Sequence, residues 1–78
     1  MIAELALVAL TRDLPEHDLQ AGDVGTVVHC YQGGGAFEVE FASASGRTIA
    51  VLTLDRAALR PLGGGDILHV RELAVGSA

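Results

Sequence analysis

Hydrophobic and polar positions alternate most clearly between residues 36 and 41. Phe37, Val39 and Phe41 fall on one side of an extended chain, while Glu38 and Glu40 fall on the other. This alternation predicts a strand with one buried and one solvated face. Four more strands are expected where apolar or β-branched runs lie between turn residues, at residues 5–10, 24–31, 47–54 and 59–62.

The longest connection follows the first of these runs. Residues 11–20 form a polar loop in which Pro15 excludes regular pairing, and Leu14 and Leu19 are expected to fold the loop back over the core. The loop ends in the stretch AGDVGTVV, residues 21–28, where two glycines and an aspartate enter a β-branched run. Such a stretch is typical of a tight turn that leads into a strand.

Two further connections complete the expected chain path. The glycines at 33–35 close a hairpin, and Asp55 can cap one helical or 3₁₀ turn before the last strand. The pattern therefore predicts an all-β chain, a small five-stranded SH3-like barrel with a C-terminal extension. Its expected core contains Val28, Cys30, Phe37, Val39 and Phe41, with two or more side chains from residues 49–54.

The barrel is expected over residues 1–62 and the extension over residues 63–78. Three glycines introduce the extension, and its middle is too apolar to remain a free tail. Its pattern does not decide between strand and helix. The second apolar face of residues 47–54 is the best surface for it to cover, in the same chain or in a second copy. The residues expected to bind a partner here are Ile67, Leu68, Val70 and Leu73.

Composition narrows the functional classes. Ten acidic and five basic residues give a net charge of −5, and the arginines are scattered along the sequence, so nucleic acid is not the expected ligand. Half of the residues are apolar, which is more than the small core of a 78-residue chain readily buries. This surplus of apolar residues favours a homodimer or a complex subunit. The chain has no membrane-length apolar run, no signal-peptide pattern and a single cysteine, so we expect a cytoplasmic protein without a membrane partner.

Possible reactive groups are few. His29 and Cys30 are adjacent and point to opposite faces of a strand, so they cannot share a metal ion. Glu38 and Glu40 lie about 6.5 Å apart on one face but are typical of a solvated strand. No catalytic, metal or cofactor site is expected. The better candidate is a partner-binding cluster in the long loop, because loops on a rigid scaffold often carry recognition. The cluster consists of Asp13, Glu16, His17 and Asp18.

The chain resembles a small bacterial family, called domain of unknown function 4926, in four segments that occur in the same order with similar gaps. These are LTRDLPEHDLQAGDVGTVVHCY, AFEVEF, GRTIAVLTL and LRPL, which together extend over most of the chain. The resemblance implies an SH3-like barrel and leaves the function open. The spacing of Gly22, Gly25 and Val27 is also similar to the KOW motif of transcription and ribosomal proteins.

The expected function is that of a non-catalytic protein-interaction module. It would act as an accessory subunit, an antitoxin-like partner or a regulator of a neighbouring bacterial protein. The alternative is a KOW-like nucleic-acid-binding module, which would require the arginines to gather on one face. A small enzyme would require an enclosed pocket, which a barrel of this size rarely contains.

Overall fold

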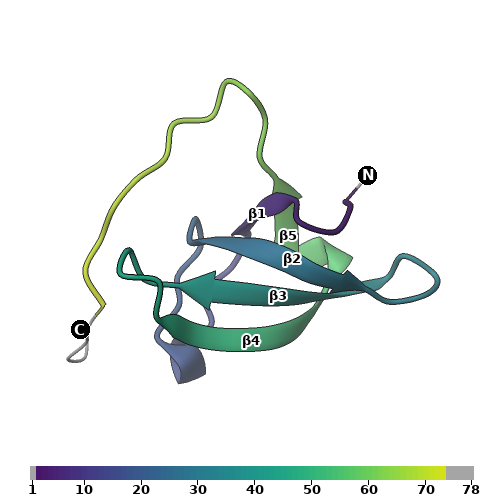
Figure 1. The fold of residues 1–78 in the computed structure, drawn as a ribbon, viewed down its shortest axis with the longest axis horizontal. Helices are drawn as coiled ribbons and strands as arrows, with labels where there is room; N and C mark the ends of the chain where they lie inside the picture. Colours follow the sequence, from purple (N-terminus) through teal and green to yellow (C-terminus); the bar gives the residue numbers. More distant parts are fainter. Residues whose placement is uncertain (1, 74–78) are drawn as a thin grey trace.

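The protein is described by a computed structural model that covers residues 2–73. It consists of one sheet of five strands and two short 3₁₀ turns (Figure 1). Each predicted strand is present, with ends that differ from the prediction by at most two residues. In chain order the elements are β1 (Leu7–Leu10), η1 (Pro15–His17), β2 (Val24–Cys30), β3 (Ala36–Ala42), β4 (Thr48–Asp55), η2 (Arg56–Ala58) and β5 (Leu59–Pro61).

All strand pairs are antiparallel, and the order across the sheet is β4-β3-β2-β1-β5. The three long strands β2, β3 and β4 run side by side in Figure 1. Strands β4 and β5 are the two edges of the sheet and do not pair with each other. The all-β prediction is therefore confirmed, whereas the sheet is not closed into a barrel.

The core lies on the inner face of the sheet. Phe37, Val39 and Phe41 of β3 are all buried there, as their alternation predicts. The long loop contributes Leu14 and Leu19, which form an isolated bridge with each other and are also buried, so the expected folding of the loop over the core is confirmed. The hydrophobic cluster is completed by Ile2, Val8, Leu10, Val27, Leu54, Ala58 and Leu59.

A β-bulge in β2 makes one core prediction wrong. Val27 lies opposite Val39 and Cys30 lies opposite Phe37, so four residues of β2 match three of β3. The extra residue turns Val28 outward, where it is exposed, and places the buried Val27 inside. Cys30 returns to the inner face and packs against the core, although it is only partly buried.

Strand β4, which has apolar residues on both faces, is less deeply buried than expected. In β4 only Leu54 is buried, while Ile49 and Leu52 pack partly covered against the core. The prediction of two or more core residues there is confirmed only in part, because Leu54 is the one buried side chain and the other two are partly buried. At the start of the chain, Leu5 is exposed in a turn with positive φ, so β1 begins only at Leu7.

The capping prediction for η2 is confirmed. Asp55 has extended backbone, and its Oδ1 accepts a hydrogen bond from the Ala58 amide at 3.1 Å. The glycine hairpin between β2 and β3 is also present, with Gly33 and Gly34 at positive φ. The sheet is therefore built from the local turn chemistry that the sequence predicts.

After β5 the chain leaves the sheet and arches back over it (Figure 1). Residues 62–73 form neither helix nor strand, and residues 74–78 of the predicted extension lie outside the described residues. The described extension does not cover Val51 on the second face of β4, which remains exposed. No helix in residues 2–73 is long and apolar enough to cross a membrane.

Candidate interaction surface

The long loop is held together by its own backbone. Leu14 and Leu19 exchange hydrogen bonds through their amides and carbonyls, and this closes the loop around η1. Asp18 adopts left-handed backbone at φ 57°, which ends η1. Asp13 accepts a hydrogen bond from the Ala21 amide at 2.8 Å, so this predicted binding residue has a structural role.

Glu16 and His17 have a different environment from Asp13. Both are exposed on η1, and their position is set by Pro15, which begins the 3₁₀ turn. They form the outward tip of the loop. The structure leaves these two side chains accessible to a partner but does not bring them to the described part of the tail, residues 62–73.

Asp23 connects the loop to β2. Its Oδ2 accepts a hydrogen bond from the Gln20 amide at 2.8 Å, while its own amide donates to the Gln20 carbonyl. The Asp23 carbonyl accepts from the Leu10 amide, which ties this turn to the end of β1. An aspartate that bonds nearby backbone is the usual residue for such a turn.

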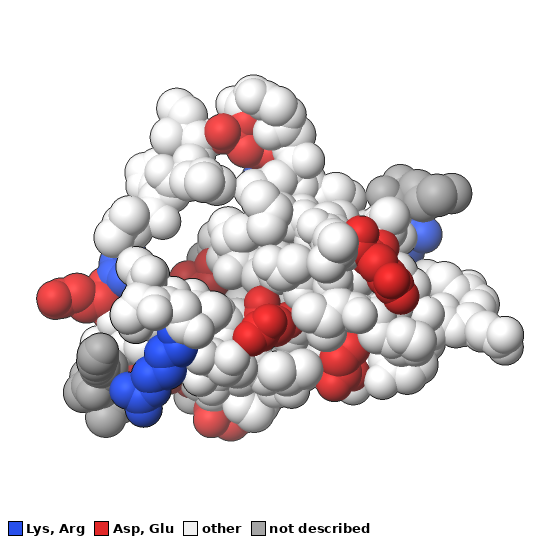
Figure 2. Space-filling view, viewed as in Figure 1, with Lys and Arg blue, Asp and Glu red and all other residues white. Residues whose placement is uncertain are grey.

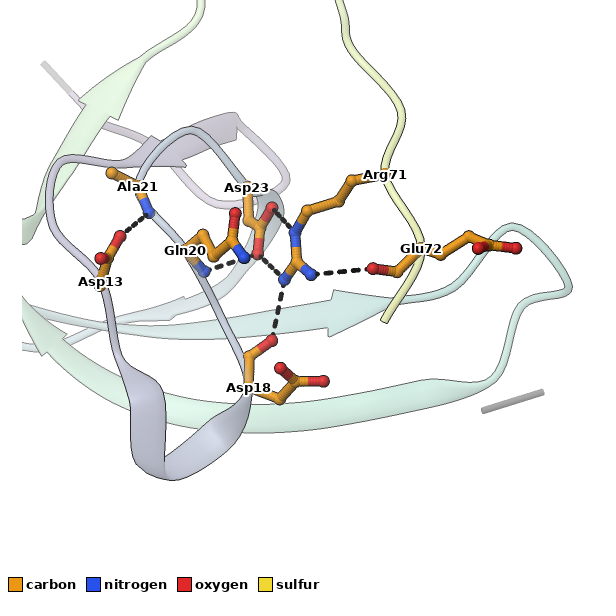
Figure 3. A network of polar contacts seen from close by, with 7 residues as sticks. All are labelled: Asp13, Asp18, Gln20, Ala21, Asp23, Arg71 and Glu72. Atoms are coloured by element: carbon orange, nitrogen blue, oxygen red, sulfur yellow. Dashed lines mark hydrogen bonds and ion pairs between the residues drawn. The ribbon is translucent and has the colours of Figure 1, made fainter. Parts of the chain in front are cut away.

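Arg71 from the tail binds this turn (Figure 3). Its Nε and Nη2 donate to the two carboxylate oxygens of Asp23 at 2.9 and 2.6 Å, and Nη2 also donates to the Asp18 carbonyl at 2.8 Å. The paired contact with one carboxylate is the geometry that favours arginine over lysine. Burial alone would raise the pKa of Asp23, but the hydrogen bonds from Arg71 and Gln20 hold that pKa below its ordinary value.

A second anchor holds the start of the tail. Asp66 accepts a hydrogen bond from the Gly63 amide at 2.6 Å and forms an ion pair with Arg60 of β5 at 3.2 Å. The Gly63 hydrogen bond, followed by those from Arg60, lowers the pKa of Asp66. The tail is thus attached to the domain at Asp66 and again at Arg71.

The segment between the two anchors is apolar and accessible. Ile67, Leu68 and Val70 are 83, 63 and 97 % exposed, respectively. An open cleft separates this part of the tail from the body of the protein (Figure 2). Leu73, just past Arg71, is partly buried. We call residues 67–70 the anchored segment.

The structure joins the two predicted binding regions through residues that the sequence analysis did not select. Arg71 contacts the Asp18 carbonyl and the Asp23 side chain, although it is one of five arginines scattered along the sequence. One signal was present. Arg71 is the only arginine or lysine among residues 63–78, so it stands out within the largely apolar extension.

The outer face of the sheet carries the two glutamates of β3. Glu38 accepts hydrogen bonds from Thr53 at 2.6 Å and Tyr31 at 3.0 Å, and Glu40 accepts one from Thr48 at 2.6 Å. The bond from Thr53 is the main cause of the lowered pKa of Glu38, followed by that from Tyr31. A general acid needs a raised pKa, so Glu38 is better suited to a stable surface network than to proton transfer.

His29 and Cys30 have different surroundings. His29 of β2 packs edge to face against Tyr31, with ring centroids 4.6 Å apart, and Cys30 points toward the core. Within residues 2–73, no three His, Cys, Asp or Glu side chains form a group that could hold a metal ion.

The fold and this surface define a small all-β domain with an anchored apolar segment. The family model for the Domain of unknown function (DUF4926) matches residues 4–61, about three quarters of the chain, and the chain belongs to that family. The predicted family membership is therefore confirmed. Asp23 lies inside the matched region, whereas Arg71 and the anchored segment lie beyond it. Neither a curated protein nor a solved structure matches the chain.

Proposed function

We propose that this protein is a non-catalytic protein-interaction module whose partner contacts the anchored segment. The observation that carries the proposal is the exposure of Ile67, Leu68 and Val70 on a segment fixed at both ends. A contiguous exposed apolar stretch is typical of an interaction site. The partner would be a protein with a complementary apolar surface, and the module would serve as its accessory subunit, antitoxin-like partner or regulator.

The anchors favour binding because they reduce the entropy that a partner must overcome. An unattached tail would lose backbone freedom when it bound, whereas a tail fixed at Asp66 and Arg71 has already lost much of it. Within the described residues, the backbone of residues 67–70 forms no hydrogen bond. An extended peptide of this kind can add to the edge of a partner's sheet.

The proposal includes an SH3-like arrangement of the sheet in a bacterial, cytoplasmic protein. Its support is the strand order β4-β3-β2-β1-β5 with a 3₁₀ turn immediately before β5, together with the family membership. In such an arrangement the connecting segments carry recognition, which suits a partner site on the tail and on the exposed loop residues Glu16 and His17.

A KOW-like nucleic-acid-binding function has weaker support. Three of the arginines already face carboxylates: Arg12 with Asp55, Arg60 with Asp66, and Arg71 with Asp23. On the face shown in Figure 2 the acidic residues are spread widely and the basic ones lie at separate places. A phosphate backbone therefore meets no concentrated positive surface there.

The test compares partner capture by three tagged forms of the full chain in extract of the native host. The doubly substituted Ile67→Gln/Val70→Gln form should lose a partner that the unchanged protein retains. Val28→Gln is the matched control, because Val28 is an exposed apolar residue on the interior strand β2, whereas Leu68 of the anchored segment lies beside β1. Its partner capture should remain unchanged.

Two results would contradict the proposal. One is equal capture by all three forms, which would remove the anchored segment from the binding surface. The other is a gel shift with nucleic acid at about micromolar protein that weakens with salt, since acidic proteins without a basic face do not give one. That second result would favour the KOW-like function.

A further inference from the structure

Within residues 2–73, strand β4 has no other strand paired to its outer edge. It extends over eight residues and pairs only with β3, because it lies at the end of the sheet. The opposite edge, β5, is three residues long and ends at Pro61, which has no amide hydrogen to donate. Strand β4 is therefore the edge able to accept another strand.

A register shift at Ile49 interrupts the start of this edge, but the following residues lack the features that prevent strand pairing. Its sequence, TIAVLTLD, contains no lysine, proline or glycine within the strand, and half of its residues are β-branched. Monomeric proteins normally protect such an edge with a charge, a proline or a covering loop. The described tail does not supply that cover, because it binds the turn at Asp23 instead.

The core is incompletely covered at the same edge. Leu52 lies opposite Val39 on the inner face, yet Val39 is fully buried and Leu52 is only partly buried. On the outer face Val51 is 47 % exposed. A strand added beside β4 would cover both side chains and would pair its free backbone groups.

The charges at the two ends of β4 fit a second copy of the same strand. Arg47 precedes the strand and is exposed, and Asp55 ends it and is also exposed. When two copies pair antiparallel, the beginning of each strand lies near the end of the other, which brings each Arg47 toward Asp55 of the other copy. Asp55 already faces Arg12 at 3.7 Å, a distance that leaves room for a closer arginine.

We propose that two copies of this chain pair through β4, antiparallel about a two-fold axis perpendicular to the sheet. The two sheets then form one continuous sheet, with the half-covered Leu52 side chains of both copies on its inner face. A two-fold axis presents the same strand from both sides, so a self-complementary edge is satisfied on both copies at once. This dimer goes beyond the proposed function, because it uses the edge of the sheet and leaves the anchored segment free.

Sedimentation equilibrium of the full chain over a range of concentrations tests the dimer. The molar mass should rise from the monomer value of 8.0 kDa toward twice that value. Val51→Lys should weaken dimerisation at least tenfold, because lysine on an edge strand opposes pairing. Within the monomer this lysine would lie beside Glu40, so the fold should tolerate it. Amide hydrogen exchange at Ala50–Thr53 should slow as the concentration rises.

Val28→Lys is the matched control, because Val28 is an exposed valine on the interior strand β2, 41 % exposed compared with 47 % for Val51. It should dimerise like the unchanged chain. If Val51→Lys loses its strand signal in circular dichroism, Arg47→Glu replaces it as the test variant. Arg47→Glu should weaken the dimer at low salt, and this difference from the unchanged chain should disappear at high salt because salt screens the charges.

Three outcomes would overturn the dimer. The chain could stay at 8.0 kDa at every concentration, or both lysine variants could weaken association equally. The third outcome is a dimer that Ile67→Gln/Val70→Gln abolishes and Val51→Lys leaves intact. That result would place the contact on the anchored segment and would leave the proposed function standing.

Discussion

Gly22 and Gly25 lie three residues apart in one turn but are required for different reasons. Gly22 has a φ of +94°, which side chains rarely adopt, and open space where a Cβ would lie. Gly25 has no such backbone constraint. A Cβ on Gly25 would instead lie 2.7 Å from Val39 Cγ1 and 2.9 Å from the Glu40 carbonyl oxygen. The second glycine therefore allows β2 to lie close against the core side chains of β3.

Gly25→Ala should consequently destabilise the fold. Because the Glu40 oxygen is backbone within the sheet, the strands must move apart, and overpacking of this kind costs about 1–3 kcal/mol. Urea denaturation followed by circular dichroism measures the loss. Gly35→Ala is the control, because its Cβ would meet no atom within 4 Å and its backbone is not left-handed. Equal stability of the two variants would show that β2 and β3 can separate freely.

For single strands, the sequence predicts where a strand lies better than it predicts which of its side chains point into the core. Alternation is a local property, so it places β3 correctly along with its three inward side chains. The bulge in β2 depends on how β2 pairs with β3, which no single strand encodes. The local pattern therefore predicts Val28 in the core, whereas the folded chain buries Val27 there.

The sequence predicts the two regions of the candidate site, the loop and the tail, but does not predict the contact between them. The apolar tail and the loop were both identified from composition, since each stands out within its own segment. Their connection depends on Arg71 and Asp23, which are 48 residues apart. Periodicity and turn chemistry report only neighbours in sequence, so only the folded chain shows which carboxylate Arg71 meets.

Acid should release the tail from the loop. The pKa of folded Asp23 is lowered, so its carboxylate stabilises the docked tail above the pKa of the free group, about 4, and this stability is lost as the pH falls through the folded pKa. Asp23→Asn keeps an oxygen for the Gln20 amide but removes the charge, and should weaken docking by about 1 kcal/mol at neutral pH.

The Arg71 Nε–H signal in NMR measures this release. In the unchanged protein its chemical shift should differ from that of free arginine at neutral pH and should return to the free value in acid, whereas Asp23→Asn should give the free value at both. Asp66→Asn is the control, because Asp66 holds Arg60 and does not contact Arg71. If the Arg71 Nε–H signal changes neither with pH nor in Asp23→Asn, another group holds the tail.

At the scale of the whole molecule, the domain and its tail have separate roles. The buried hydrophobic cluster runs from Ile2 to Leu59, and the family model matches residues 4–61. Beyond Leu62, the described chain adds exposed apolar side chains and two ion pairs but no member of that cluster. The tail therefore adds surface to a fold that is already complete without it.

A chain truncated after Leu62 should fold. It keeps the whole buried cluster and the hydrogen bond from the Leu62 amide to the Leu7 carbonyl. The main loss is the contact between Arg71 and Asp23, a partly exposed ion pair worth about 1 kcal/mol, so the melting temperature should fall by only about 4–8 °C in a domain of this size. Arg71→Gln in the full chain should reproduce most of that fall, and thermal melting by circular dichroism measures both. If the truncated chain lacked a cooperative transition while Arg71→Gln melted normally, residues beyond 62 would be part of the fold itself.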